Sequence, residues 1–128
     1  MKIASMIARY LLGLGFLIFG LNGFLNFIPQ GPMPTGPAGD YIKVLMATHY
    51  MLPVSAFELI AAVLLLLNRW VPLALTILGP ILVNILLFHI LMQPATLPMA
   101  LVFVFLWALV WLSVKSAFAG LFQSRVEN

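Results

Sequence analysis

Four long apolar stretches constrain the fold of this chain more than any other feature. They lie at about residues 7–27, 51–67, 71–92 and 97–114. A helix that crosses about 30 Å of hydrocarbon needs about 20 mostly apolar residues, and each stretch is close to that length. The sequence therefore predicts an all-α fold, an integral membrane four-helix bundle, built as a single transmembrane domain over residues 1–128.

The composition excludes the other broad classes of protein. Hydrophobic residues make up 64% of the chain and charged residues only 7%, whereas soluble domains carry about 25% charged residues. So few charges cannot cover a water-exposed surface, and disordered chains have the opposite composition. The chain has no cysteine, which excludes disulfides and thiolate metal sites.

The long connection at residues 28–50 follows the first apolar stretch. Its first half is rich in proline and glycine, so we expect an extended or turned backbone there. Asp40 then has the character of an N-cap for a short helix from Tyr41 to about His49. This helix either lies on the bundle as an interfacial lid or continues into the second span with a kink at Pro53.

The distribution of positive charge predicts the orientation in the membrane. With four spans, both chain ends and the loop at residues 68–70 share one side. That side carries Lys2, Arg9, Arg69, Lys115 and Arg125. Positive residues favour the cytoplasmic side, so we expect a multi-pass membrane protein with both termini in the cytoplasm. The positive residues form no basic stripe suited to nucleic acid.

Polar residues inside the spans mark the candidate site, because ionisable and amide groups are costly in hydrocarbon. At 1.5 Å per residue, Glu58 and Asn84 lie at about the same depth in the outer half of the bilayer. Asn22, Asn26 and His89 lie in the same half, closer to the surface. We therefore predict a polar pocket in the outer leaflet. Its predicted ligand-binding residues are Glu58, Asn84, Asn22, Asn26 and His89.

Each of these residues also has a structural interpretation. Glu58 either binds a proton, a cation or the polar head of a ligand, or is a structural carboxyl bonded to Asn84 or His89. Asn22 and Asn26 are four residues apart and share a helix face. They bond across helices, which we favour, or cap the end of the first span. Glu58, His89 and His49 form no ligand motif, so no metal site is predicted.

Other span residues are predicted to serve packing and anchoring. We expect the Arg9 side chain to extend to the cytoplasmic headgroups with its stem along the helix. Gly13 and Gly20 suit close packing between helices. Pro80 removes the helical partner of the Thr76 carbonyl, so a kink is expected in the third span.

Three segments of the chain resemble the DoxX family of small bacterial membrane proteins. The first helix of that family resembles residues 9–24, which read RYLLGLGFLIFGLNGF. The second resembles residues 58–69, and a third-helix pattern resembles residues 71–89. Many members carry a lysine near the position of Gly23, and this chain does not. The resemblance covers nearly the whole chain and implies a four-helix membrane bundle with Arg9, Glu58 and Asn84 at family-like positions.

The resemblance also implies a location in the bacterial cytoplasmic (inner) membrane and an association with membrane redox or stress functions. Together with the polar pocket, it favours an accessory or ligand-binding subunit that binds a quinone-like or lipid-like molecule. A homodimer or a redox protein is the expected partner besides the bilayer. Two alternatives remain open, a small proton-coupled transporter centred on Glu58 and a membrane enzyme that uses Glu58 and His89.

Overall fold

The computed structural model describes residues 2–29 and 31–127, and within these ranges it contains helices and no strands. Five α-helices and two 3₁₀ helices follow one another along the chain. They are α1 (Lys2–Leu25), α2 (Pro37–Ala47), α3 (Met51–Leu66), α4 (Val71–Leu91), η1 (Pro94–Thr96), α5 (Leu97–Val114) and η2 (Lys115–Phe122).

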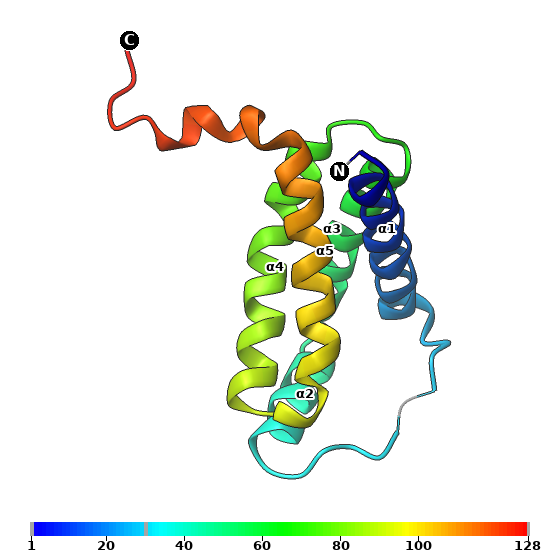
Figure 1. Cartoon of the computed structure of the whole chain (residues 1–128). Coiled ribbons are helices and arrows are strands. Elements are labelled where there is room, and N and C mark those ends of the chain that lie inside the picture. Colours follow the sequence, from blue (N-terminus) through cyan, green and yellow to red (C-terminus); the bar gives the residue numbers. More distant parts are fainter. Residues whose placement is uncertain (1, 30, 128) are drawn as a thin grey trace.

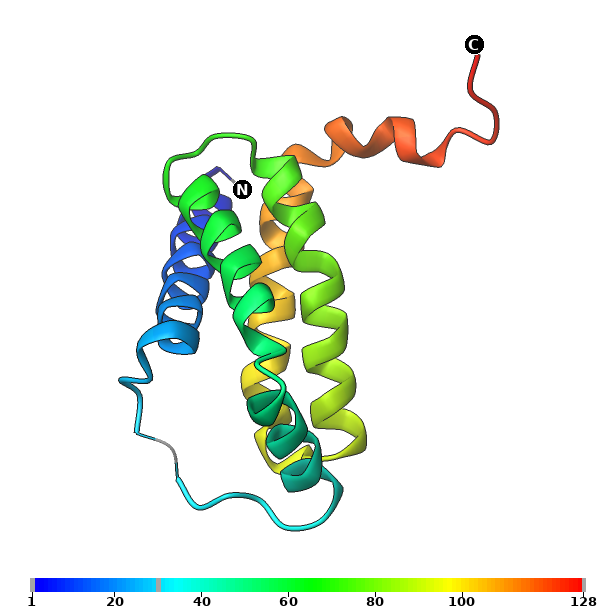
Figure 2. The same ribbon diagram turned by 180° about the vertical axis from the view of Figure 1, so that it is seen from behind.

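The helices α1, α3, α4 and α5 form an up-and-down bundle (Figure 1). Helix α1 packs against α3 and α5, and α4 packs against the same two helices, so the four helices form a closed ring. Both chain ends and the loop between α3 and α4 lie at one end of the bundle, and α2 lies at the other (Figures 1 and 2). The predicted all-α architecture is confirmed.

Three of the predicted spans are long and apolar enough to cross a membrane by themselves. They are α1, α4 and the segment Pro94–Phe122 that contains α5. Helix α3 has 16 residues, which is about 24 Å at 1.5 Å per residue and shorter than the hydrocarbon layer. With α2 it forms a bent pair, which raises the number of candidate spans to four.

The start of α2 and its connection to α3 both differ from prediction. Helix α2 begins at Pro37, so Asp40 lies in its first turn and Gly36 is the N-cap residue. A carboxylate in the first turn is favourable because it faces the positive end of the helix dipole. The 85° bend lies between Ala47 and Met51. No kink is needed at Pro53, which sits in the first turn of α3, where a missing N–H costs nothing.

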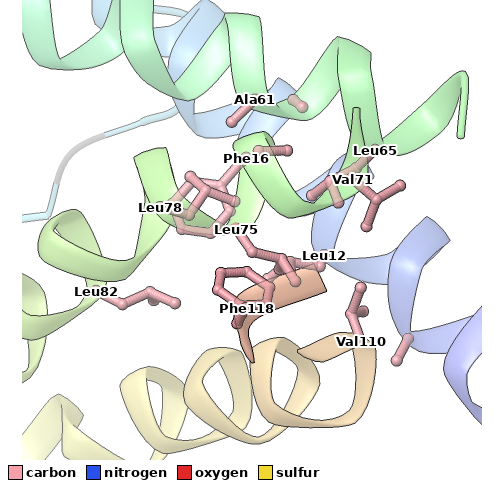
Figure 3. Packing of buried hydrophobic residues seen from close by; sticks show 13 residues of the cluster. Leu12, Phe16, Ala61, Leu65, Val71, Leu75, Leu78, Leu82, Val110 and Phe118 are labelled. Carbon is pink, nitrogen blue, oxygen red and sulfur yellow. The ribbon is translucent and has the colours of Figure 1, made fainter. Parts of the chain in front are cut away.

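Buried apolar side chains from α1, α3, α4 and α5 pack together inside the bundle (Figure 3). Leu12 and Phe16 of α1 meet Ala61 and Leu65 of α3 there, and Leu75 of α4 joins them. Close contact between α1 and α3 depends on glycine, as predicted: a Cβ added at Gly20 would lie 2.8 Å from Leu59 Cγ. The region nearer α2 is packed differently and contains a cavity.

Arg9 makes a bond between α1 and α3 that was not predicted, and Pro80 lies inside α4. The Arg9 guanidinium donates to the Leu65 carbonyl near the C-terminal end of α3. This bond places the Arg9 side chain beside the C-terminal end of α3, and the predicted extension to the headgroups stays a prediction. Since that helix end carries the negative pole of the dipole, a cation there is stabilising. Helix α4 continues as one element through Pro80, and a kink at this residue stays a prediction.

Candidate functional site

A cavity of about 720 Å³ lies at the α2 end of the bundle, and all five α-helices contribute to its wall. Its lining is mostly apolar and aromatic, with a small number of polar side chains. This composition is typical of sites that bind small lipophilic molecules. The polar residues that line it are Asn22, Asn26, His49, Ser55, Glu58 and His89.

Burial distinguishes the inner end of the cavity from its opening. Phe16, Glu58 and Ala100 line the inner end and are each at most 5% exposed. Residues near the opening, such as Phe24 and Met46, are largely exposed. Ser55 and Glu58, at 2% and 5% exposed, are therefore the most buried polar groups that a ligand in the cavity would reach.

The Glu58 carboxyl faces this cavity without a partner from the described residues. No hydrogen bond or ion pair joins it to another residue within 2–29 and 31–127. No fully enclosed side-chain oxygen or nitrogen of the described residues lacks a partner, so the carboxyl oxygens are open to the cavity. None of the lysines or arginines in the described chain lines the cavity. A buried carboxyl in this position is available to a ligand.

Ser55 is the second polar group on the cavity side of α3. It precedes Glu58 by three residues and therefore lies on the same helix face. Its side chain packs against Gly23 of α1 so closely that a Cβ added at Gly23 would overlap Ser55 Oγ. The absence of a side chain at Gly23 thus lets the hydroxyl reach the space between α1 and α3.

Asn22 and Asn26 line the cavity and also end helix α1. Asn22 Oδ1 accepts a 2.8 Å hydrogen bond from the Ile28 N–H. Asn26 has a left-handed backbone with φ of 50°, a conformation in which asparagine often follows the last helical residue. The capping interpretation is confirmed, and neither side chain bonds across helices within the described structure. The amide NH₂ of Asn22 is the group that remains for a ligand.

His89 reaches the cavity from the end of α4. Its Nδ1 is hydrogen-bonded to Thr96 Oγ1, and its ring packs edge-on against Phe88. Phe88 in turn stacks on Tyr41 of α2 with ring centroids 5.7 Å apart, which fixes α2 beside the opening. Glu58 and His89 line one cavity, but no hydrogen bond joins them in the described structure.

Asn84 does not line the cavity, and its predicted place in the pocket is wrong. Its side chain is exposed on the outer surface of α4 and donates from Nδ2 to the Pro80 carbonyl at 3.0 Å. The cavity-facing residues of α4 are Leu82, Ile85 and His89. At 100° per residue, Asn84 is rotated by about 200° from Leu82. The position of Asn84 along α4 does not by itself reveal the direction of its side chain.

Aromatic side chains form one wall of the cavity. Phe103 of α5 makes edge contacts with Phe16 and Phe19 of α1, with ring centroids 5.4 and 5.8 Å apart. No residue of α5 was predicted to line the pocket. Every residue near Phe103 in the chain is apolar, so the pattern carries no signal that separates a cavity-lining residue from a lipid-facing one.

Histidine, aspartate and glutamate side chains do not gather in groups of three or more that could hold a metal ion, within the residues that the structure describes. Comparison with known proteins finds no matching family, no matching curated protein and no matching solved structure. The cavity and its side chains are therefore the basis on which a function can be proposed.

Proposed function

We propose that this chain is a membrane protein that binds a quinone-like amphipathic molecule, with the polar head of the ligand at Glu58. The observation that carries the proposal is the Glu58 carboxyl, which is 5% exposed and open to the cavity of about 720 Å³ without a partner from the described residues. A buried polar group without a partner is costly. A ligand that supplies a hydrogen bond at this point removes that cost.

The neighbouring groups favour a head that both donates and accepts hydrogen bonds. The Glu58 carboxyl and the Ser55 hydroxyl line the cavity from α3, and the Asn22 amide lines it from α1. A quinol hydroxyl can donate to the carboxyl, and a ring oxygen can accept from the amide NH₂. Phe16 and Phe103 present aromatic surface to a planar ring. The cavity also falls within the range of about 300–1,000 Å³ for small-molecule sites.

The proposed arrangement in the bilayer has four crossings, with α2 and α3 together supplying the second. Both chain ends lie in the cytoplasm in this arrangement. Lys2, Arg69 and Lys115 lie at the same end of the bundle as the two termini, and positive residues favour the cytoplasmic side. The cavity is then in the outer leaflet of the bacterial inner membrane. On this arrangement the chain is an accessory subunit of a membrane redox or stress complex, as its resemblance to the DoxX family implies.

The test is retention and binding of the ligand by purified protein. Native mass spectrometry of protein from bacterial membranes should show a bound quinone, and a short-chain benzoquinol should raise the melting temperature. The variant Glu58→Gln should lose the shift and keep its helical content. Asp40→Asn also replaces a carboxylate by an amide, but outside the cavity, and should retain the quinol-dependent shift in melting temperature. Protein that carries no quinone and gives no shift with the quinol would contradict the proposal.

The same cavity supports transport as the alternative function, since a carrier also needs a buried group that binds its cargo. Wild-type protein in liposomes would then move protons, and Glu58→Gln would abolish the flux. Equal flux in both variants would exclude this alternative. A membrane enzyme that uses Glu58 and His89 would require both groups within reach of one substrate position. Turnover of a substrate by the Glu58→Gln variant would exclude this enzyme.

A further inference from the structure

Asn84 places a polar side chain on the outer, lipid-facing surface of α4. It lies seven residues before Leu91, which is about 10 Å along the helix axis from the end of the span. Nδ2 donates to the Pro80 carbonyl, and this bond uses one of the two N–H groups. Oδ1 and the second N–H make no hydrogen bond with the residues that the structure describes.

Other exposed hydroxyls on the spans are satisfied within their own helices. Thr76 Oγ1 donates to the Pro72 carbonyl at 2.8 Å, and Ser113 Oγ donates to the Val110 carbonyl at 2.6 Å. Hydrocarbon tails offer no donor or acceptor at the depth of Asn84, and an unsatisfied polar group in that environment costs several kcal/mol. Asn84 therefore needs a partner from outside the chain, whereas Thr76 does not.

We infer that α4 is the interface of a homodimer and that Asn84 pairs with Asn84 of a second copy. A carboxamide is self-complementary, because it carries both a donor and an acceptor. Two copies related by a twofold axis present the same patch to each other. Each Oδ1 can then accept from the free N–H of the other copy. This symmetric pair satisfies all the groups that a single chain leaves open.

The surface around Asn84 suits contact with another helix. Leu87 and Val83 are exposed on the same side of α4. A groove of about 230 Å³ next to Val83 lies between α4 and α5 and is lined by apolar side chains. Gly79 lies in this groove, and the nearest atom to a Cβ added there is 3.8 Å away. A leucine of the second copy would fill this space and add van der Waals contact.

The first experiment compares the oligomeric state of matched variants in lipid bilayers. Wild-type protein and Thr76→Val should be dimeric, because the Thr76 hydroxyl is bonded inside its own helix. Asn84→Leu should dimerise on the order of tenfold more weakly, since interhelical hydrogen bonds in membranes are modest, and Asn84→Gln should recover part of the loss. A monomeric wild type, or equal dimerisation of Asn84→Leu, would overturn the inference.

The second experiment maps the interface and uses the fact that the chain has no cysteine. Leu87→Cys keeps Asn84 in place and should form a disulfide across the twofold axis, which requires Cα atoms within about 7 Å. Adding Asn84→Leu should reduce the cross-link. Phe57→Cys, on the exposed side of α3, is the control and should remain uncross-linked. If Phe57→Cys cross-links as well as Leu87→Cys, the dimer interface is not on α4. Association with a different protein in place of a second copy would also overturn the inference.

This interface is separate from the proposed ligand site, because Asn84 does not line the cavity. Loss of the dimer in Asn84→Leu should therefore leave the quinol-dependent shift in melting temperature unchanged. Conversely, Glu58→Gln should lose ligand binding and remain dimeric. The two proposals can thus fail independently.

Discussion

The guanidinium of Arg9 on α1 donates a hydrogen bond to the backbone carbonyl of Leu65 near the C-terminal end of α3. The Leu65 carbonyl also accepts from the Asn68 N–H, where the chain leaves the helix. The arginine is half-buried and lies 4.5 Å from the centroid of the Tyr10 ring. One cation therefore ties the first two long helices together at the end opposite the cavity.

Removing this cation should destabilise the bundle without affecting the ligand site. We expect Arg9→Gln to reduce stability by about 1.5–3 kcal/mol, the range for hydrogen bonds to charged groups, and to lower the melting temperature in detergent. Arg9→Lys should recover part of the loss because it keeps the charge. Arg69→Gln removes a charge that makes no side-chain bond to a described residue and is the control. Equal melting temperatures for Arg9→Gln and wild type would contradict this role.

The contact between Gly23 and Ser55 should respond to compensating changes in size. A Cβ at Gly23 would overlap Ser55 Oγ and lie 2.6 Å from Ser55 Cβ. Gly23→Ala should therefore cost about 1–3 kcal/mol of stability, the range for overpacking. The double variant Gly23→Ala with Ser55→Gly removes both clashing atoms and should recover stability in denaturation measurements. Gly120→Ala, with open space around the added atom, should be neutral. If the stability changes of Gly23→Ala and Ser55→Gly simply add in the double variant, the two side chains are not in contact.

The Trp107 indole supports α4 near its proline. Nε1 donates to the Leu75 carbonyl at 3.0 Å, one turn before Pro80, whose missing N–H leaves the Thr76 carbonyl without its helical partner. Trp107→Phe keeps a ring but removes the donor, so we expect a loss of about 1 kcal/mol, seen as a lower melting temperature. Trp70→Phe changes an exposed side chain, 73% accessible, and should have little effect. If Trp107→Phe melts at the same temperature as wild type, the hydrogen bond from Trp107 to Leu75 contributes nothing to stability.

The helices were predictable from the sequence because their signal is strong and one-dimensional. Apolar length locates a span, and Pro72 and Pro98 lie at the starts of α4 and α5, where a missing N–H costs nothing. The start of α2 was missed by a turn. Asp40 is a good N-cap type, but Pro37 has a backbone angle suited to the first turn and Gly36 precedes it. Local preferences of similar strength compete there, and the sequence does not decide between them.

The candidate site was less predictable because depth in the bilayer is only one of its coordinates. Sequence position gives the depth of Asn84, but the direction of its side chain depends on which face of α4 meets α3 and α5. Apolar residues lie on every side of α4, so no amphipathic pattern reveals that face. Glu58 was identified correctly as a cavity residue since a buried acid has few other places to lie. Phe103 carried no signal at all.

The size of the cavity can be changed without touching its polar groups, and this gives the last prediction. Ala100 of α5 lines the cavity and is 2% exposed, so Ala100→Leu places additional methylene groups in the space that we assign to the ligand ring. We expect binding of a short-chain benzoquinol to weaken on the order of tenfold, as for the loss of about 1–3 kcal/mol by steric mismatch. The melting temperature without ligand should change little, because the added atoms enter space that the protein leaves unfilled.

Leu101→Phe adds bulk at the next residue of α5, whose side chain is exposed, and should leave binding unchanged. Isothermal titration of the three proteins in detergent separates the outcomes. If Ala100→Leu binds the quinol as tightly as wild type, the ligand does not occupy the inner end of the cavity. Binding that is lost in Glu58→Gln but kept in Ala100→Leu would then place the ring nearer the opening, between Phe24 and Met46, with only its polar edge reaching the carboxyl.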